Sequence, residues 1–224
     1  MYRLLKEKFS YLRTREGKRL LKISIISLVV IIGVGIGVYS YISYVNRLSE
    51  KKFVQAKNFY FQAQNEDKVD EREKTLEKAK NLFQEVVSQK FWWSNKQEAY
   101  LYLADCYYML GDLDESIKIL EEFNGKYPRS YFSSWAKLKL ALIYEKKKSY
   151  NKAIEVYQQI EKEYPQSSIA PEALLGQARC QERVGNKKKA VEIYRRLISR
   201  YPLSNEAVLG KVILQKFALE SKKS

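Results

Sequence analysis

The residues with the most chemistry to offer are two cysteines, because the chain contains no histidine. Histidine is the commonest general base and metal ligand, so its absence argues against most hydrolytic and zinc chemistry. Cys106 and Cys180 lie inside apolar stretches of helical spacing, which is typical of buried packing residues. The sequence has no phosphate-binding loop, nucleophile motif or carboxylate cluster. We therefore expect no catalytic residue, no metal site, no cofactor and no enzyme activity.

The charge of the chain suggests a second kind of chemistry, the binding of anions. There are 41 Lys and Arg residues against 26 Asp and Glu, a net charge of +15. Residues 1–22 hold eight basic and two acidic residues (8 − 2 = +6), and the other +9 is scattered without one basic face. Because nucleic-acid binding needs a continuous basic surface, we expect no nucleic-acid partner.

An uncharged stretch organises the N-terminal part of the chain. Residues 23–45 are aliphatic, Gly, Ser and Tyr, and about 20 such residues in a helix cross the ~30 Å core of a bilayer. The stretch is longer than the apolar part of a cleavable signal, and no small-residue cleavage site follows it. We expect a single retained transmembrane helix; a buried core helix is the alternative.

Basic residues flank this stretch unequally. Eight precede it, and four follow it closely: Arg47, Lys51, Lys52 and Lys57. The excess keeps the N-terminus in the cytoplasm and places the C-terminal part across the membrane. The basic segment itself either lies on anionic lipid as an amphipathic helix or is a solvated tail.

The membrane helix offers two contact surfaces. Gly33, Gly37 and Ser40 share one face, where small residues let two helices approach closely, so the helix can form a homodimer or contact a partner. The alternative is that these are the glycines common in any membrane helix. An aromatic belt at the headgroups is expected from Tyr39, Tyr41 and Tyr44.

The segment after the membrane stretch predicts a helical hairpin. Residues 38–64 contain neither Gly nor Pro, so the membrane helix should continue without a break to Gln64. A polar turn over 65–71 and an amphipathic helix ending near Val87 would close the hairpin.

The C-terminal part repeats with a period of 37 residues. Tyr-Pro-x-Ser recurs at 127–130, 164–167 and 201–204. The same offset relates two sets of small residues, which let paired helices approach: Ala104, Ala141 and Ala178, and Ser116, Ala153 and Ala190. Gly111 and Gly185 fit the tight turn between the two helices, Pro ends the second helix, and the following Ser is placed to cap the next.

At these residues the chain resembles the tetratricopeptide repeat, which has small residues at its eighth and twentieth positions and Pro at its thirty-second. The resemblance implies an all-α solenoid, here with repeats three residues longer than the usual 34. We expect a basic tail (1–22), a transmembrane helix (23–45), a helical extension and divergent first repeat (46–93), three repeats (94–203) and a capping helix and tail (204–224).

The Tyr-Pro-x-Ser variant resembles bacterial envelope tetratricopeptide proteins, and the whole plan is similar to the ancillary subunit of the Sec translocon. This resemblance implies a scaffold in the bacterial inner membrane with its repeats in the periplasm. Its partners would be translocon, chaperone or envelope-assembly components, or secreted clients. A cell-division adaptor and an organelle receptor with cytosolic repeats are the alternatives.

The family resemblance also implies where partners bind. In such solenoids the first helices of the repeats line a concave groove, and the groove candidates are Tyr108, Trp135, Leu138, Leu142, Lys146, Arg179 and Arg183. The leucines could instead belong to the core, and the basic residues to a solvated face. Trp92 and Trp93 could touch the membrane interface or pack between repeats. The two cysteines are two periods apart, too far for a disulfide.

Overall fold

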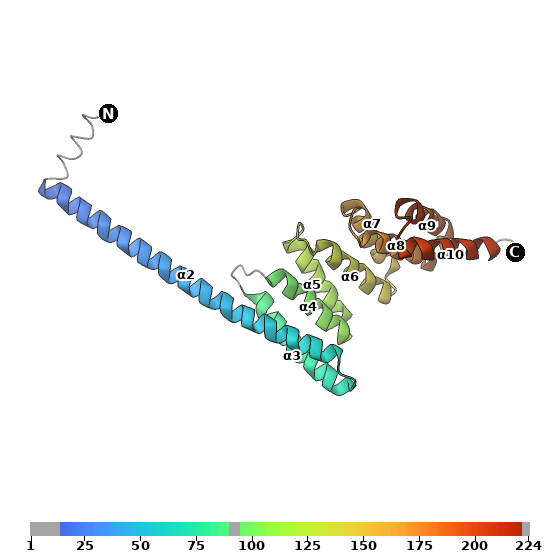
Figure 1. Cartoon of the computed structure of the whole chain (residues 1–224), viewed down its shortest axis with the longest axis horizontal. Coiled ribbons are helices and arrows are strands. Elements are labelled where there is room, and N and C mark those ends of the chain that lie inside the picture. Colours follow the sequence, from blue (N-terminus) through green and yellow to red (C-terminus); the bar gives the residue numbers. More distant parts are fainter. Residues whose placement is uncertain (1–13, 90–94, 221–224) are drawn as a thin grey trace, which may run out of the picture. The chain divides into compact units, whose positions relative to one another are not determined.

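The computed structural model describes residues 14–89 and 95–220 and divides the chain into two compact units, residues 1–51 and 52–224. All regular structure in the described ranges is helical, as the sequence predicts (Figure 1). The helices are α2 (Arg15–Gln64), α3 (Val69–Ser88), α4 (Lys96–Met109), α5 (Leu113–Lys126), α6 (Ser133–Lys146), α7 (Tyr150–Glu163), α8 (Ala170–Arg183), α9 (Lys187–Arg200) and α10 (Asn205–Glu220).

Helix α2 contributes residues to both units. Its single span from Arg15 to Gln64 confirms the expectation of one uninterrupted helix. It is also the one helix in the described residues long and apolar enough to cross a membrane, and its most apolar window has no buried residue. Isoleucines and valines exposed over several turns are costly in water.

The repeats fold as antiparallel helix pairs because their small residues allow close approach. Ala141, Ala153, Ala178 and Ala190 are all fully buried where neighbouring helices cross. The first of the three repeats within 94–203 has Ser116 at the equivalent position, and the Ser116 hydroxyl donates a 2.7 Å hydrogen bond to the carbonyl of Ala104. That bond satisfies a polar group that would otherwise be buried without a partner.

The turn inside each helix pair has one residue with positive φ, which is Gly in two repeats and Lys in the third. Gly111 and Gly185 have φ of 86° and 82°, the left-handed region that costs glycine little. Lys148 takes the same position in the middle repeat with φ of 58°. In all three turns the next residue's N–H bonds back to the helix, for example Ser149 to the Tyr144 carbonyl at 2.8 Å.

The Tyr-Pro-x-Ser segments form turns that join successive repeats. In each, the Ser N–H donates to the Tyr carbonyl at 3.0 Å. The expectation that all three serines cap the next helix is wrong for two of them. Ser204 does so, with its Oγ accepting from the Ala207 N–H at 3.0 Å. A second turn follows Ser130 and Ser167, so these two helices begin later, after Phe132 and Ile169.

The first hairpin of the repeat domain is built around aromatic residues. Phe53 and Tyr60 of α2 pack with Phe83 of α3 and with Tyr102 of α4, and the Phe83 and Tyr102 rings stack with centroids 5.2 Å apart. Aromatic pairs add stability beyond the area that they bury. The same cluster contains the fully buried Ala56, Ala63 and Ala79, so the aromatic contacts are added to small-residue packing like that of the later repeats.

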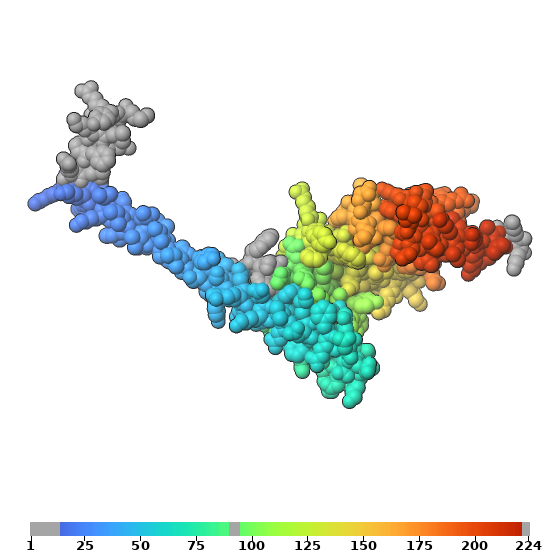
Figure 2. Space-filling model, viewed as in Figure 1, coloured from blue at the N-terminus to red at the C-terminus, as the bar shows by residue number. Residues whose placement is uncertain are grey.

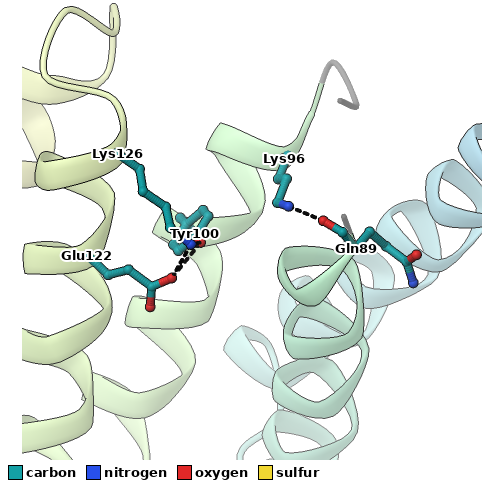
Figure 3. A network of polar contacts seen from close by, with 5 residues as sticks. All are labelled: Gln89, Lys96, Tyr100, Glu122 and Lys126. Atoms are coloured by element: carbon teal, nitrogen blue, oxygen red, sulfur yellow. Dashed lines mark hydrogen bonds and ion pairs between the residues drawn. The ribbon is translucent and has the colours of Figure 1, made fainter. Parts of the chain in front are cut away.

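A polar network joins α4 to its neighbours near the N-terminal end of α4 (Figure 3). Tyr100 donates to Glu122 at 2.8 Å, and Lys126 reaches both residues. Lys96 donates to the carbonyl of Gln89, so the two sides of segment 90–94 are tied together. The predicted contact residues Trp92 and Trp93 lie outside the described residues.

Both cysteines are core residues, as the sequence predicts. Cys106 and Cys180 are fully buried free thiols. Burial raises the pKa of each thiol to about 12, so neither forms a reactive thiolate near neutral pH.

Candidate functional site: the face formed by the first helices

The first helices of the repeats are α4, α6, α8 and α10, and three of them, α4, α6 and α10, carry exposed large apolar residues. We call them the A helices and name α5, α7 and α9 the B helices. On α4 to α10 the exposed large hydrophobic residues are Met109, Trp135, Leu142, Val208, Leu209, Val212 and Leu219. All of them lie on A helices, and none lies on the described B helices. Exposed apolar residues gathered on one set of helices are typical of interaction sites, so the A-helix face is the candidate binding surface.

Helix α6 contributes the strongest anchor. Trp135 is 49% exposed and Leu142 is 37% exposed, two turns apart on the same helix. Leu138 lies between them but is only 4% exposed and belongs to the core, which is the alternative that the sequence left open. A Trp that remains half exposed is typical of the residues that dominate binding energy in interfaces.

Helix α10 extends the same face. Leu209, Val212 and Leu219 are 52%, 57% and 63% exposed. They stand one period after Glu172, Leu175 and Glu182 of α8. From its sequence this helix was expected only as a cap, so these residues were not among the groove candidates, although the 37-residue offset identifies them. Figure 2 shows this helix at the end of the repeat domain.

Arg179 is not a free cation. Its Nη2 donates to Glu145 Oε2 at 2.8 Å, its Nε bonds the other carboxylate oxygen, and the Tyr157 hydroxyl also donates to Glu145. Burial alone would raise the pKa of Glu145, but Arg179 outweighs burial and holds this pKa below its usual value. The pair therefore joins α6 to α8 across one repeat and is part of the frame of the site.

A second charged pair joins α4 to α6. Lys139 forms an ion pair with Asp105, whose other carboxylate oxygen accepts a 3.3 Å hydrogen bond from the Tyr60 hydroxyl. Burial lowers the pKa of the Lys139 ammonium to about 8. Both pairs link neighbouring A helices, so they fix the spacing of the apolar side chains between them.

At the C-terminal ends of α4 and α6 the A-helix face opens into a pocket of about 590 Å³. Its lining residues are Gln64, Asn65, Arg72, Tyr108, Met109 and Lys146. Two of these, Tyr108 and Lys146, were expected in the groove, and the Lys146 ammonium lies 4.1 Å from the centroid of the Tyr108 ring. Such a contact is a cation–π interaction, which holds the lysine in place.

Another hollow, of about 580 Å³, lies between α5, α6 and α7. Several of its polar side chains form ion pairs or hydrogen bonds with one another. Lys137 pairs with Glu163 at 2.7 Å, and the Tyr144 hydroxyl donates to Glu121 at 2.7 Å. We regard this hollow as part of the repeat contact and not as a second site.

The remaining predicted contacts are placed as follows. Arg183 is exposed at the end of α8 and has no ion pair in the described ranges. Tyr39, Tyr41 and Tyr44 are exposed on α2, and a Cβ added to Gly33 or Gly37 would meet no atom within 4 Å. Membrane and homodimer contacts of these residues stay predictions. Within residues 14–89 and 95–220, no group of His, Cys, Asp and Glu could hold a metal ion.

Three solved structures with a similar fold are distant in sequence. A putative kinesin light chain from Podosopora anserina with nearly identical TPR-like repeats has a TM-score of 0.54 and 15% identity, covering 74% of this chain and 82% of that one. A tetratricopeptide repeat protein from Parabacteroides merdae has a TM-score of 0.61 and 16% identity, covering 79% and 62%. MamA from Desulfovibrio magneticus has a TM-score of 0.52 and 15% identity, covering 75% and 90%. These likenesses concern the fold.

A comparison with curated proteins found no match. Two family models match the chain, a tetratricopeptide repeat over residues 172–204 and a tetratricopeptide repeat-like domain over residues 22–170. The second match covers well over half of the chain, and the chain therefore belongs to the tetratricopeptide repeat-like domain family.

Proposed function

We propose that the protein is a single-pass membrane-anchored scaffold that holds a segment of a partner protein on its A-helix face. The tetratricopeptide fold is a protein-interaction scaffold. The observation that carries the proposal is the distribution of exposed apolar residues, which lie on the A helices of α4 to α10 and are absent from the described B helices. A surface selected only for solubility would have no reason for this asymmetry.

Three features support a membrane anchor. The apolar residues of α2 are exposed to more than half of their surface at positions such as Val29, Ile31 and Ile36. The family match begins at residue 22, so it includes the apolar stretch 23–45. Basic residues are in excess on its N-terminal side. A retained helix with a cytoplasmic N-terminus accounts for all three.

With this orientation the repeat domain lies outside the cytoplasm, in a bacterium on the periplasmic side of the inner membrane. A scaffold there would assist protein translocation or envelope assembly, as the likeness in plan to the Sec-translocon ancillary subunit suggests. Its partners would be translocon or assembly components, chaperones or secreted clients, with membrane lipid around α2. An envelope or cell-division adaptor has the same sidedness, whereas an organelle receptor has the reverse.

Sidedness can be tested with introduced cysteines, because Cys106 and Cys180 are buried and do not react. Ser199→Cys places a thiol on the exposed surface of α9, and Ser10→Cys places one in the basic tail. In intact cells, a membrane-impermeant maleimide should label Ser199→Cys at once and Ser10→Cys only after permeabilisation. The unchanged chain serves as the background control.

Labelling of Ser10→Cys in intact cells, with Ser199→Cys protected, would reverse the topology and favour the cytosolic receptor. Labelling of both without permeabilisation would mean that α2 does not span the membrane. Extraction of the unchanged chain from membranes by alkaline carbonate would lead to the same conclusion, since a transmembrane helix resists this treatment.

A further inference from the structure

The pocket at the C-terminal ends of α4 and α6 has a basic lining. Of its lining residues, Arg72 and Lys146 are basic and none is acidic. We propose that this pocket, which we call the Arg72–Lys146 pocket, binds the carboxylate of an acidic side chain of a partner protein.

The pocket exists because the first hairpin departs from the 37-residue register. The polar segment 65–68 between α2 and α3 places Asn65 and Arg72 beside the ends of α4 and α6. In the later repeats the corresponding turns have three residues, with Gly111, Lys148 or Gly185 in the middle, and the second helix of each pair has 14 residues against 20 in α3. Arg72 lies in the first turn of the longer α3.

The two cations are available to a ligand. Neither Arg72 nor Lys146 forms an ion pair within the described part of the chain. Arg72 stands between Glu71 and Glu73 in sequence; Glu71 pairs with Lys74, and neither glutamate forms an ion pair with Arg72. Two other cations of the face are neutralised, Lys139 by Asp105 and Arg179 by Glu145, whereas Arg183 has no ion pair in the described ranges but does not line this pocket. Two unneutralised cations in one pocket lower the energy of an anion there.

The other lining groups specify the kind of anion. The Gln64 and Asn65 side-chain amides are N–H donors, and Asn65 uses one of its two N–H groups on the Phe61 carbonyl. Met109 and the Tyr108 ring provide apolar contact for a short alkyl stem. A carboxylate on such a stem is the side chain of Asp or Glu, and Arg recognises it through paired N–H groups.

Position connects this pocket to the rest of the candidate site. Tyr108, Met109 and Lys146 lie in the register that carries Trp135 and Leu142, so a polypeptide seated on the apolar side chains can place an acidic residue here. The inference deepens the proposed function by giving the partner a charge. It depends on that function only in taking the ligand to be a protein.

The chain offers a natural reporter for this pocket, since Met109 is one of its two methionines and the other is Met1. We would label the full chain with ¹³C-methyl methionine in nanodiscs and add N-acetyl-tetraglutamate amide. The Met109 methyl signal should shift in a saturable way and the Met1 signal should not. The isosteric tetraglutamine peptide should cause no shift.

Arg72→Gln combined with Lys146→Gln should weaken the tetraglutamate response about tenfold, because both charge-assisted contacts are removed. Arg183→Gln is the matched control, since Arg183 stands one period after Lys146 but does not line the pocket. It should leave the response unchanged. The Met109 signal without peptide reports whether each variant is folded.

Three results would overturn the inference: no Met109 shift with millimolar tetraglutamate, an equal response in the double variant, or an equal response to inorganic phosphate. The last would indicate a general anion site. None of them bears on the sidedness labelling or on the apolar part of the face, so the proposed function would stand or fall separately.

Discussion

Replacing Arg179 with Ala should destabilise the repeat domain, although Arg179 was expected to contact a partner. The variant leaves Glu145, whose side chain is 18% exposed, without its cation. Removing one partner of a buried pair costs about 3–5 kcal/mol, and removing one partner of an exposed pair costs ~0–1 kcal/mol. Because Arg179 itself is 42% exposed, we expect a loss of about 2 kcal/mol in the free energy of unfolding at pH 7.

The loss should depend on pH in a defined direction. In the native chain the folded pKa of Glu145 is below its usual value, so the pair stabilises the fold at neutral pH and loses this effect as the pH falls through that lowered pKa. Without Arg179, burial remains and raises the pKa of Glu145 above the unfolded value of ~4.3. The variant should therefore be most destabilised at pH 7, and the difference from wild type should shrink below about pH 4.

Urea unfolding of the full chain in detergent, followed by far-UV circular dichroism, measures this difference. Arg183→Ala is the matched control, since it removes an exposed arginine one turn away and should change stability by less than about 0.5 kcal/mol. Equal effects of the two substitutions, or an Arg179→Ala effect that does not change with pH, would refute our account of the pair.

Three further predictions concern the core and the turns. Lys148→Gly should stabilise the domain by about 0.5–1 kcal/mol, because glycine adopts the left-handed backbone at this position at little cost. Gly185→Ala should destabilise the domain for the same reason, and urea unfolding measures both changes. Gly176→Ala should destabilise by about 1–3 kcal/mol, because its Cβ would lie 2.4 Å from the Tyr157 ring, whereas Gly210→Ala, whose nearest contact is 3.5 Å, should be neutral or stabilising. Both cysteines should resist iodoacetamide at pH 8 in the folded chain and react in urea, since burial raises each thiol pKa to about 12; rapid alkylation of folded protein would contradict this.

The periodic part of the fold could be predicted from sequence because one structural unit recurs with fixed spacing. The small residue at the position of Ala141 lets two helices approach closely in every repeat. Its register therefore predicts the helix pair, the turn and the core together. The family resemblance, counted in the same register, made Trp135 and Leu142 groove candidates and left Leu142 open as a core residue; both are exposed on α6. The same register places Leu209 and Val212 one period after Glu172 and Leu175, at groove positions, although the last helix was expected only as a cap.

The rest depended on contacts between side chains of different repeats. No sequence pattern indicates that Arg179 meets Glu145, 34 residues away, because the pairing depends on how far successive repeats rotate. The pocket was missed for a similar reason, since Arg72 enters it from a hairpin outside the repeat register. The burial of Leu138 against the exposure of Leu142 likewise depends on the angle between α6 and its neighbours.

The central claim is that partners bind the A-helix face, and photo-crosslinking in living cells tests it most directly. A benzophenone amino acid would replace Leu142 or Val212 on A helices and, as controls, the exposed B-helix residues Lys118 or Gln158. We predict discrete protein adducts from the first two positions and none from the controls. Adducts mainly from Lys118 and Gln158, or equally from all four positions, would contradict the claim.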